Sequence, residues 1–270
     1  MCMQDSVESH YRSSGIVNRI QKALAKAGHD LKNLDPDALA GADEFHVGGR
    51  KATSLIADEL DIHATDCVLD VGCGIGGASR FLARKTGAHV TGIDLTPEFV
   101  DAAIQLSKLV GMEDGVNFQQ GSATGIPFEK NVFDVVTMLH VGMNVEDKLL
   151  MMSELERVCK PTGTIIIYDI IRKGTDTLNY PMPWATTEKF SFPEPAAKYI
   201  EAARASGLVL LKQVDHSKLA KKFLASASDE LPALTLGHLM GPNFMAMRDN
   251  LALAVRDDVV SPVMMTFRAG

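Results

Sequence analysis

Short apolar runs alternate with amphipathic segments through the middle of the chain. Five runs read as buried strands: Cys67–Val71, His89–Asp94, Val116–Gln119, Phe133–Leu139 and Thr164–Ile171. Three segments between them have helical spacing: Gly76–Thr86, Pro97–Val110 and Lys148–Cys159. Strands that alternate with helices in this way predict an α/β fold with a mostly parallel, doubly wound sheet. Ligands of such sheets bind at the carboxyl ends of the strands.

The two flanks of this region have more helical character. Five flanking segments are predicted: helices at Ser14–Ala27, Arg50–Leu60 and Ala196–Ser206, a strand at Leu208–Val214, and helices with breaks over Lys218–Arg256. The breaks fall at Pro232 and at Gly241-Pro242. A last apolar run, Pro262–Arg268, reads as a closing strand, and its proline predicts an edge or first-residue position.

Composition narrows the classes of partner. The chain has 270 residues, of which 46% are hydrophobic and 23% charged, as expected for a globular domain. Its net charge of -7, without a basic run, argues against nucleic acid and anionic membrane surfaces. The four cysteines have neither C-x-x-C spacing nor metal-site neighbours, which favours reduced thiols, a cytoplasmic location and no metal. No apolar run is long enough to span a bilayer.

A glycine-rich loop, Asp70–Gly77, joins the first strand to the first helix of the sheet. Glycines let the backbone turn tightly, and the helix start offers free N–H groups to an anion. Because Gly72, Gly74 and Gly77 also fit the dinucleotide pattern, the loop alone leaves a nicotinamide cofactor open.

Two acidic residues favour S-adenosylmethionine at this loop. Asp70, two residues before the first glycine, is expected to accept from an ammonium group and would repel a pyrophosphate. Asp94, which ends the second strand, is expected to accept from both ribose hydroxyls, although a dinucleotide enzyme would have the same acid.

Three segments resemble a known family. Val68–Gly77 resembles motif I of the class I S-adenosylmethionine-dependent methyltransferases, and Gly92–Leu95 resembles their ribose-binding position. Gly121–Phe128 is similar to the adenine-side segment of the ubiquinone/menaquinone and sterol methyltransferases. The resemblance implies a seven-stranded Rossmann-like sheet, an N-terminal helical lid over residues 1–60, and a methyltransferase domain over 61–270 with pocket insertions at about 173–195 and 217–258.

The resemblance also implies which residues bind the cofactor: Asp70, Gly72, Gly74, Gly76, Asp94, Leu95, Ser122, Ala123, Leu139 and His140. One position departs from the pattern, because the family usually has aspartate where this chain has Ser122. Serine is shorter and neutral, so adenine would be held by the backbone N–H of Ala123 and by apolar stacking, for example on Leu95.

Candidate catalytic groups follow the fourth and fifth strands. His140 would face the methionine end of the cofactor, as a base or as an orienting group, or would only bond the backbone. Asp169 would bind an ammonium substrate or take a proton, or would form a structural pair with Arg172. Arg172 would otherwise clamp a substrate carboxylate, and Asn144 would bond the substrate or cap a helix.

The flanks add further candidates. The segments around Tyr11, His46, His140 and Tyr180–Trp184 resemble bacterial small-molecule methyltransferases related to the glycine/sarcosine/dimethylglycine N-methyltransferases. By that resemblance Tyr11 closes over the methionine part and His46 lies near the methyl group. Tyr180 and Trp184, in a proline-stiffened insert, are expected to wall the substrate pocket, with packing as the alternative for Trp184.

The predicted function is methyl transfer from S-adenosylmethionine to a small-molecule acceptor. N-methylation of an amine or amino acid leads, and C- or O-methylation of an isoprenoid, sterol or polyketide-type compound is the alternative. A nicotinamide-dependent oxidoreductase and a non-catalytic cofactor-binding module are alternatives from other classes. The sequence leaves open whether the chain forms a homo-oligomer.

Overall fold

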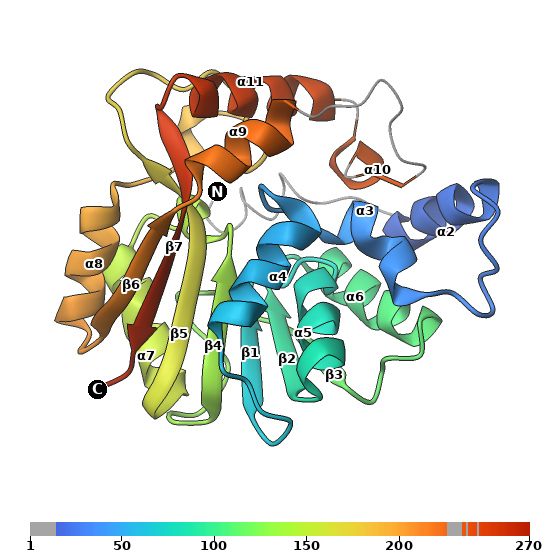
Figure 1. The fold of residues 1–270 in the computed structure, drawn as a ribbon, viewed down its shortest axis with the longest axis horizontal. Helices are drawn as coiled ribbons and strands as arrows, with labels where there is room; N and C mark the ends of the chain where they lie inside the picture. Colours follow the sequence, from blue (N-terminus) through green and yellow to red (C-terminus); the bar gives the residue numbers. More distant parts are fainter. Residues whose placement is uncertain (1–14, 226–233, 236, 242) are drawn as a thin grey trace.

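A seven-stranded sheet runs through the middle of the computed structural model, which describes residues 15–225, 234–235, 237–241 and 243–270 (Figure 1). The strands are β1 (Cys67–Val71), β2 (His89–Asp94), β3 (Val116–Gln120), β4 (Phe133–Leu139), β5 (Cys159–Arg172), β6 (Val209–Asp215) and β7 (Val260–Arg268). Their order is β3-β2-β1-β4-β5-β7-β6. Strands β1 to β5 pair in parallel, and β7 is antiparallel to both of its neighbours. The predicted mostly parallel α/β sheet is therefore confirmed.

The prediction of an edge position for the last strand is wrong. Strand β7 lies between β5 and β6, and Pro262 is its third residue, opposite Ile170 of β5. The proline removes one N–H from the ladder, but its carbonyl oxygen still accepts from the His216 N–H at 2.9 Å. Every residue of β7 except Arg268 is buried, so the burial of an apolar strand outweighs the loss of one donor.

Helices cover both faces of the sheet. One face carries α4 (Gly49–Glu59) and α5 (Gly77–Thr86), and the other carries α7 (Lys148–Val158) and α8 (Ala196–Ala205). Helix α6 (Pro97–Leu109) packs on β2 and β3. Side chains along β5 alternate between the two faces: Ile165 and Ile167 pack with α7 and α8, whereas Ile166 and Tyr168 pack with α4 and α5. Since both faces are covered, residues 165–171 of β5 are buried on both sides and are apolar except for Asp169.

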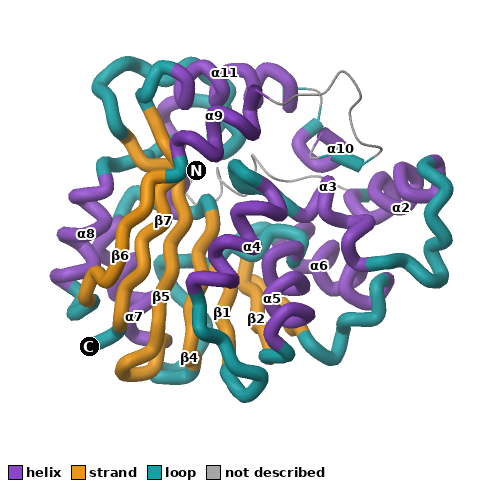
Figure 2. The backbone as a smooth tube through the Cα atoms, viewed as in Figure 1, coloured by secondary structure: helices purple, strands orange, loops and turns teal. Residues whose placement is uncertain are grey.

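A helical cap lies over the carboxyl ends of the parallel strands (Figures 1 and 2). Its helices are α2 (Ile16–Lys26), η1 (Pro36–Leu39), α3 (Ala40–Asp43), α9 (Ser217–Ala225), α10 (Gly237–Met240) and α11 (Phe244–Arg256). Two small cores hold it. One joins α2 to α6 around Ile20 and Leu106, and the other joins α9 and α11 to the insert after β5, around Leu224, Leu251 and Trp184. The predicted break at Gly241-Pro242 is confirmed, because α10 ends at Met240 and α11 begins at Phe244, whereas the predicted break at Pro232 falls outside the described residues.

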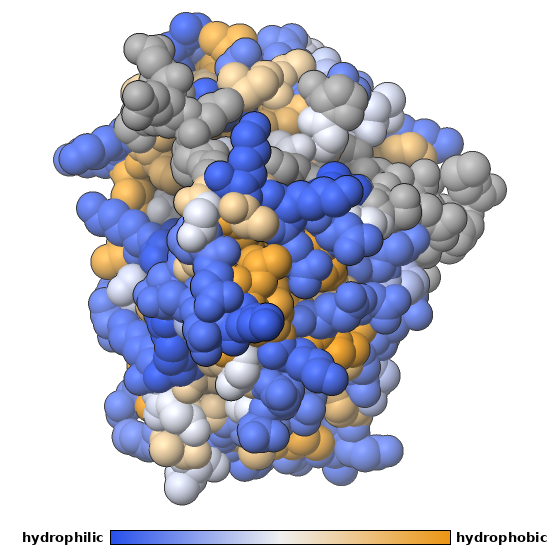
Figure 3. All heavy atoms as spheres, turned by 90° about the vertical axis from the view of Figure 1, so that its right-hand side faces the viewer, coloured by the Kyte–Doolittle hydropathy of each residue, from blue (hydrophilic) through white to orange (hydrophobic). Residues whose placement is uncertain are grey.

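The surface is polar where it can be seen. On the face in Figure 3, hydrophilic side chains predominate and hydrophobic ones form small separate areas. Among the helices of the described residues, none has both the length and the apolar character needed to cross a bilayer.

Candidate active site

A cavity of about 550 Å³ opens between the carboxyl ends of the strands and the cap. This volume lies within the roughly 300–1,000 Å³ of small-molecule sites. One part of its wall comes from the sheet: Gly72, Gly74, Asp94, Leu95, Thr96, Gly121, Ser122, Ala123, Thr124, Leu139 and His140. The other part comes mostly from the cap and the insert: Phe45, His46, Val47, Met143, Asn144, Trp184, Phe223, Leu224, Phe244, Arg248 and Leu251.

The loop between β1 and α5 shapes the first part of the cavity. Gly72 and Gly74 have φ of 73° and 54°, in the left-handed region that favours glycine. A Cβ on Gly72 would lie 2.2 Å from Val141 Cγ2, so this position also needs the missing side chain. The backbone N–H groups of Gly72 and Cys73 both donate to the Ile93 carbonyl, at 2.7 and 2.9 Å. These bonds fix the loop against the end of β2.

Asp94 links the glycine loop to the cavity. Its Oδ2 accepts from the Gly74 N–H and its Oδ1 from the Thr96 N–H, both at 2.9 Å. Burial raises the pKa of Asp94 to about 6, although both backbone hydrogen bonds act against the rise. Because each carboxylate oxygen has a second lone pair, Asp94 can still accept from hydroxyl groups of a ligand.

The segment after β3 forms the neighbouring wall. Ser122 Oγ lies 2.9 Å from Thr124 Oγ1 and accepts from the Thr124 N–H at 3.2 Å. Arg157 of α7 braces this segment from outside, because it donates to the carbonyls of Ile126 and Phe128. Apolar Leu95, Ala123 and Phe99 lie around the same part of the cavity. This wall suits a flat ring that needs apolar contact, with Ser122 as a short polar neighbour.

Asp70 lies at the end of β1, beneath the glycine loop. It is 1% exposed and is not among the cavity-lining residues. Its Oδ2 accepts from Ser79 Oγ at 2.6 Å and its Oδ1 from Thr137 Oγ1 at 3.0 Å. Asp70 thus ties β1 to α5 and β4 behind the loop, and its expected contact with an ammonium group stays a prediction. Gly76 is not among the cavity-lining residues either, and it precedes α5 as the N-cap residue with a φ of 83°.

Two imidazoles, His46 and His140, meet at the junction of the two parts of the cavity. Their ring centroids are 6.0 Å apart, and the His140 ring stacks on Tyr168 at 5.2 Å. His140 follows β4 with a φ of 55°, and within the described part of the chain its buried Nε2 has no hydrogen-bond partner. Burial lowers the pKa of His46 to about 4, and burial together with His46 lowers that of His140 well below 6.5. Both rings are thus neutral near pH 7.

The structure brings only some of the predicted acceptor residues to the cavity. Asn144 and Trp184 line it, and Asn144 Nδ2 donates to the Trp184 carbonyl at 2.6 Å. Arg172 and Tyr180 do not line it, and Arg172 donates instead to the Asp176 carbonyl. Tyr11 lies outside the described residues.

Asp169 is not among the cavity-lining residues either, and its expected contact with the acceptor stays a prediction. It is fully buried, and its Oδ2 accepts from the Tyr199 hydroxyl at 2.7 Å. Its expected structural pair with Arg172 is absent from the ion pairs of the described residues, and the cation that acts on its charge is Lys148. Asp169 therefore supports the cavity wall from behind.

The sequence reading missed most of the apolar wall: Phe45, Val47, Phe99, Met143, Phe223, Phe244 and Leu251. These residues belong to five separate segments, and no local pattern distinguishes an apolar side chain that faces a cavity from one that packs in a core. In the described residues, no group of three or more His, Cys, Asp or Glu side chains could hold a metal ion.

The sequence is similar to known methyltransferases. Residues 69–167 match a family described as a methyltransferase domain. Methyltransferase GfsG of Streptomyces halstedii is 33% identical over 141 residues, which are 52% of this chain and 50% of that protein. The glycine/sarcosine/dimethylglycine N-methyltransferase of Actinopolyspora halophila is 30% identical over 141 residues, which are 48% of this chain and 25% of that protein. The chain thus spans half or less of the length of these relatives.

The fold is similar to a solved structure along the whole chain. Geranyl diphosphate C-methyltransferase of Streptomyces coelicolor, in complex with Mg²⁺, geranyl diphosphate and S-adenosyl-L-homocysteine, matches with a TM-score of 0.70 and 18% identity. The match covers 100% of this chain and 98% of that one. The predicted Rossmann-like fold, with a seven-stranded, mostly parallel sheet, is confirmed by this likeness.

Proposed function

We propose that this chain, whose residues 69–167 match a methyltransferase-domain family, is an S-adenosylmethionine-dependent methyltransferase that acts on a small apolar acceptor. One observation carries the proposal. A single cavity joins a sheet-side part, with Gly72, Gly74 and Asp94, to an apolar part under the cap, with His46 and His140 between them. A methyl donor and its acceptor need this arrangement, because the reaction depends on holding two reactants in line.

The sheet-side part fits the donor. Asp94 has lone pairs left for two ribose hydroxyls, and Leu95 and Ala123 offer apolar contact to adenine. S-adenosylmethionine, when bound, supplies a methyl group on a positively charged sulfur. Asp70 then acts as a positioning residue, since its bonds to Ser79 and Thr137 hold the ends of β1 and β4 beside the loop.

The cap-side part favours an acceptor without a strong charge. Its wall is largely apolar, as in Met143 and Trp184, and the Arg248 guanidinium in this wall donates to the Leu224 carbonyl at 2.8 Å. The acidic residues in the lining besides Asp94 are Glu146 and Asp147, which are exposed, and Asp147 already caps α7 through the Leu150 N–H. An exposed carboxylate is a weak anchor for an ammonium group, because water screens it. We therefore rank O- or C-methylation above N-methylation, which the sequence placed first.

His46 and His140 offer a base at the junction between the two parts of the cavity. A neutral hydroxyl is a poor nucleophile, and a positioned base that removes its proton contributes roughly 10²–10⁴-fold to the rate. Neutral imidazoles can take that proton, whereas charged ones cannot. His46 is 6% exposed, and low exposure to water strengthens the polar contacts of its ring.

Separate calorimetric titrations with S-adenosylmethionine and with NAD test the cofactor. We expect the first to bind and the second not to bind, and Asp94→Asn to weaken binding of the first about tenfold or more through the loss of charge-assisted hydrogen bonds. Binding of NAD without S-adenosylmethionine would instead support the oxidoreductase alternative. Methyl-labelled donor with a panel of apolar phenols, alcohols, enols and amines then tests the acceptor, and cofactor binding without any labelled product would support the non-catalytic alternative.

The remaining parts of the proposal concern organisation and location. We infer that residues 1–60 act as a lid, with the inserts at about 173–195 and 217–258 completing the acceptor pocket. A cytoplasmic location is supported by the free thiols of Cys67, Cys73 and Cys159. The net charge of -7 supports partners other than nucleic acid.

A further inference from the structure

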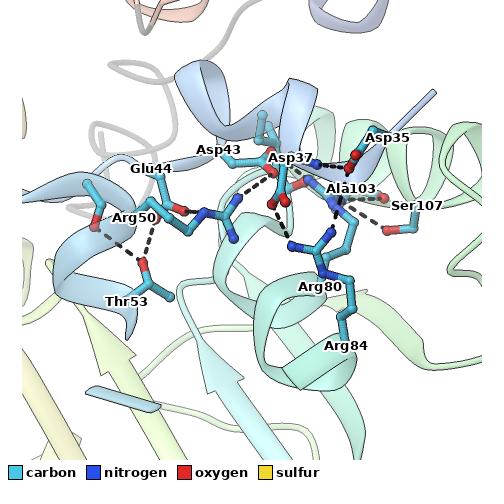
Figure 4. Close-up of polar contacts among 12 residues, drawn as sticks. Asp35, Asp37, Asp43, Glu44, Arg50, Thr53, Arg80, Arg84, Ala103 and Ser107 are labelled. Atoms are coloured by element: carbon cyan, nitrogen blue, oxygen red, sulfur yellow. Dashed lines mark hydrogen bonds and ion pairs between the residues drawn. The ribbon is translucent and has the colours of Figure 1, made fainter. Parts of the chain in front are cut away.

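Behind His46 lies a short chain of buried polar groups. His46 Nε2 is 2.9 Å from Thr53 Oγ1, and the Thr53 hydroxyl donates to Glu44 Oε2 at 2.6 Å. The same Glu44 oxygen is 3.3 Å from His46 Nε2. Thr53 is fully buried, and Glu44 and His46 are 5% and 6% exposed. Figure 4 shows Glu44 and Thr53 turned toward each other, at the edge of a larger polar cluster.

The hydrogen-bond chemistry of this chain fixes the proton on His46. Thr53 has one hydroxyl proton, and the carboxylate of Glu44 can only accept. The Thr53 oxygen therefore acts as an acceptor toward His46, so His46 Nε2 must carry a proton. In a neutral imidazole the other ring nitrogen, Nδ1, is then a lone-pair acceptor.

Glu44 keeps its negative charge because a cation is paired with it. Arg50 Nε lies 2.9 Å from Glu44 Oε1, while Arg80 pairs with the neighbouring Asp43 (Figure 4). The negative charges of Asp43 and Glu44 are thus matched by the positive charges of Arg80 and Arg50. Burial raises the pKa of Glu44, and Arg50 and the Thr53 hydrogen bond lower it.

His140, the second imidazole at the junction, does not share the hydrogen bonds that Thr53 and Glu44 give to His46. The groups that act on His140 are its burial and the His46 ring, and both oppose its protonation. Tyr168, which lies against both imidazoles with centroid distances of 6.1 Å to His46 and 5.2 Å to His140, donates its hydroxyl to the Val47 carbonyl at 2.8 Å. Of the two imidazoles, His46 is the one with a carboxylate beside it, because Glu44 Oε2 lies 3.3 Å from its Nε2. Burial and the Arg50 charge lower the pKa of His46, while a hydrogen bond to the Gly49 backbone raises it.

We propose that Glu44, acting with Thr53, holds His46 as the Nε2–H tautomer and stabilises its imidazolium, so that His46 Nδ1 takes the proton of a hydroxyl acceptor. The inference rests on the proposed function and assigns the roles within its site. His140 Nε2 orients the acceptor oxygen. The acceptor O–H bond breaks and its proton passes to Nδ1. The oxygen electron pair forms the bond to the methyl carbon, while the carbon–sulfur bond breaks and its electron pair stays on sulfur.

The tautomer is tested on the free protein, without donor or acceptor. Two-bond proton–nitrogen spectra of the ¹⁵N-labelled imidazoles distinguish Nδ1–H from Nε2–H, and His46→Gln identifies the His46 signals. We expect the Nε2–H form in the wild type and in Thr53→Ser, and a mixture of both forms in Thr53→Val and Glu44→Gln. Asp58→Asn, in an exposed ion pair of the same helix, is the control. An Nδ1–H form in the wild type, or an unchanged tautomer in Thr53→Val and Glu44→Gln, would overturn the proposal.

Kinetics test the consequence for the reaction. The rise of kcat/KM with pH should move to lower pH in Glu44→Gln, because the imidazolium loses its stabilising charge. The plateau should fall about 10- to 100-fold, as part of the contribution of a general base. Thr53→Ser should retain the wild-type profile. A lower plateau with an unmoved pH limb would mean that Glu44 is only structural. If the protein fails to bind S-adenosylmethionine, the proposed function fails, whereas the tautomer result stands or falls separately.

Discussion

Arg80 Nη2 lies 2.6 Å from Asp43 Oδ1, and both side chains are almost completely buried (Figure 4). Arg80 belongs to the first turn of α5, directly after the glycine loop, and Asp43 ends α3 in the cap. A Cβ on Gly77 would lie 2.4 Å from Asp43 Cβ, so the two segments also touch through their backbones. The pair therefore joins the cap to the start of the helix that carries the glycine loop.

Removing this guanidinium should destabilise the protein strongly. Arg80→Met leaves the Asp43 carboxylate buried without its closest cation and removes the hydrogen bonds to Ile75 O and Ser107 Oγ. We expect a loss of about 3–5 kcal/mol in the free energy of unfolding, measured by urea denaturation. Arg84→Met, which removes a half-exposed pair with Asp37, is the matched control and should cost about 1 kcal/mol or less. Equal losses in both variants would contradict the role of the buried pair.

The geometry of the glycine loop predicts different cofactor affinities for two Gly→Ala variants. Gly72→Ala puts a Cβ at a φ of 73° and 2.2 Å from Val141 Cγ2, so the loop must shift. Strain of about 1–3 kcal/mol and the displaced backbone should lower the affinity for S-adenosylmethionine at least tenfold in calorimetry. Gly125→Ala, in the adenine-side segment, has open space around the new Cβ and should bind normally. Normal binding by Gly72→Ala would show that the loop does not contact the cofactor.

The cap should control the acceptor and not the donor. Phe223 lines the cavity from α9 and is 42% exposed, so Phe223→Ser removes apolar contact area with little change in the core. We expect the KM for an apolar acceptor to rise about 3- to 10-fold, as for a loss of ~1 kcal/mol of apolar burial. The affinity for S-adenosylmethionine should stay the same. Lys222→Ser, on the same helix and outside the cavity lining, should change neither quantity.

The raised pKa of the buried Asp169 predicts that the stability of the protein depends on pH. Burial raises its pKa to about 6, against the opposing effects of the Tyr199 hydrogen bond and the Lys148 charge. Because the folded state holds this proton more tightly than the unfolded state, the contribution of Asp169 to stability is full below about pH 4 and declines as the pH rises to 6 and above. Thermal melts across this range should show a shallower decline in Asp169→Asn than in the wild type. Parallel curves would mean that Asp169 ionises normally in the folded protein.

The sequence predicts the parallel part of the sheet well because strands such as β1 and β4 are short apolar runs and amphipathic helices separate them from the next strands. It predicts the position of β7 poorly, since Pro262 suggests an edge and only the pairing partners reveal an interior strand. In the candidate site, too, contiguous motifs can be predicted from the sequence and contacts between side chains cannot. Asp94 and Gly72 belong to one contiguous motif, whereas the role of Glu44 depends on a contact with Thr53 that spacing along the chain does not reveal.

The order of strands has a consequence for folding during synthesis. Strand β5 and strand β6 are made before the strand that separates them, so β5 must wait for residues 260–268 before its second edge is paired. Until then, an apolar edge is open to other chains. We expect nascent chains that stop before residue 260 to depend on chaperones, although they already contain the complete glycine loop and Asp94.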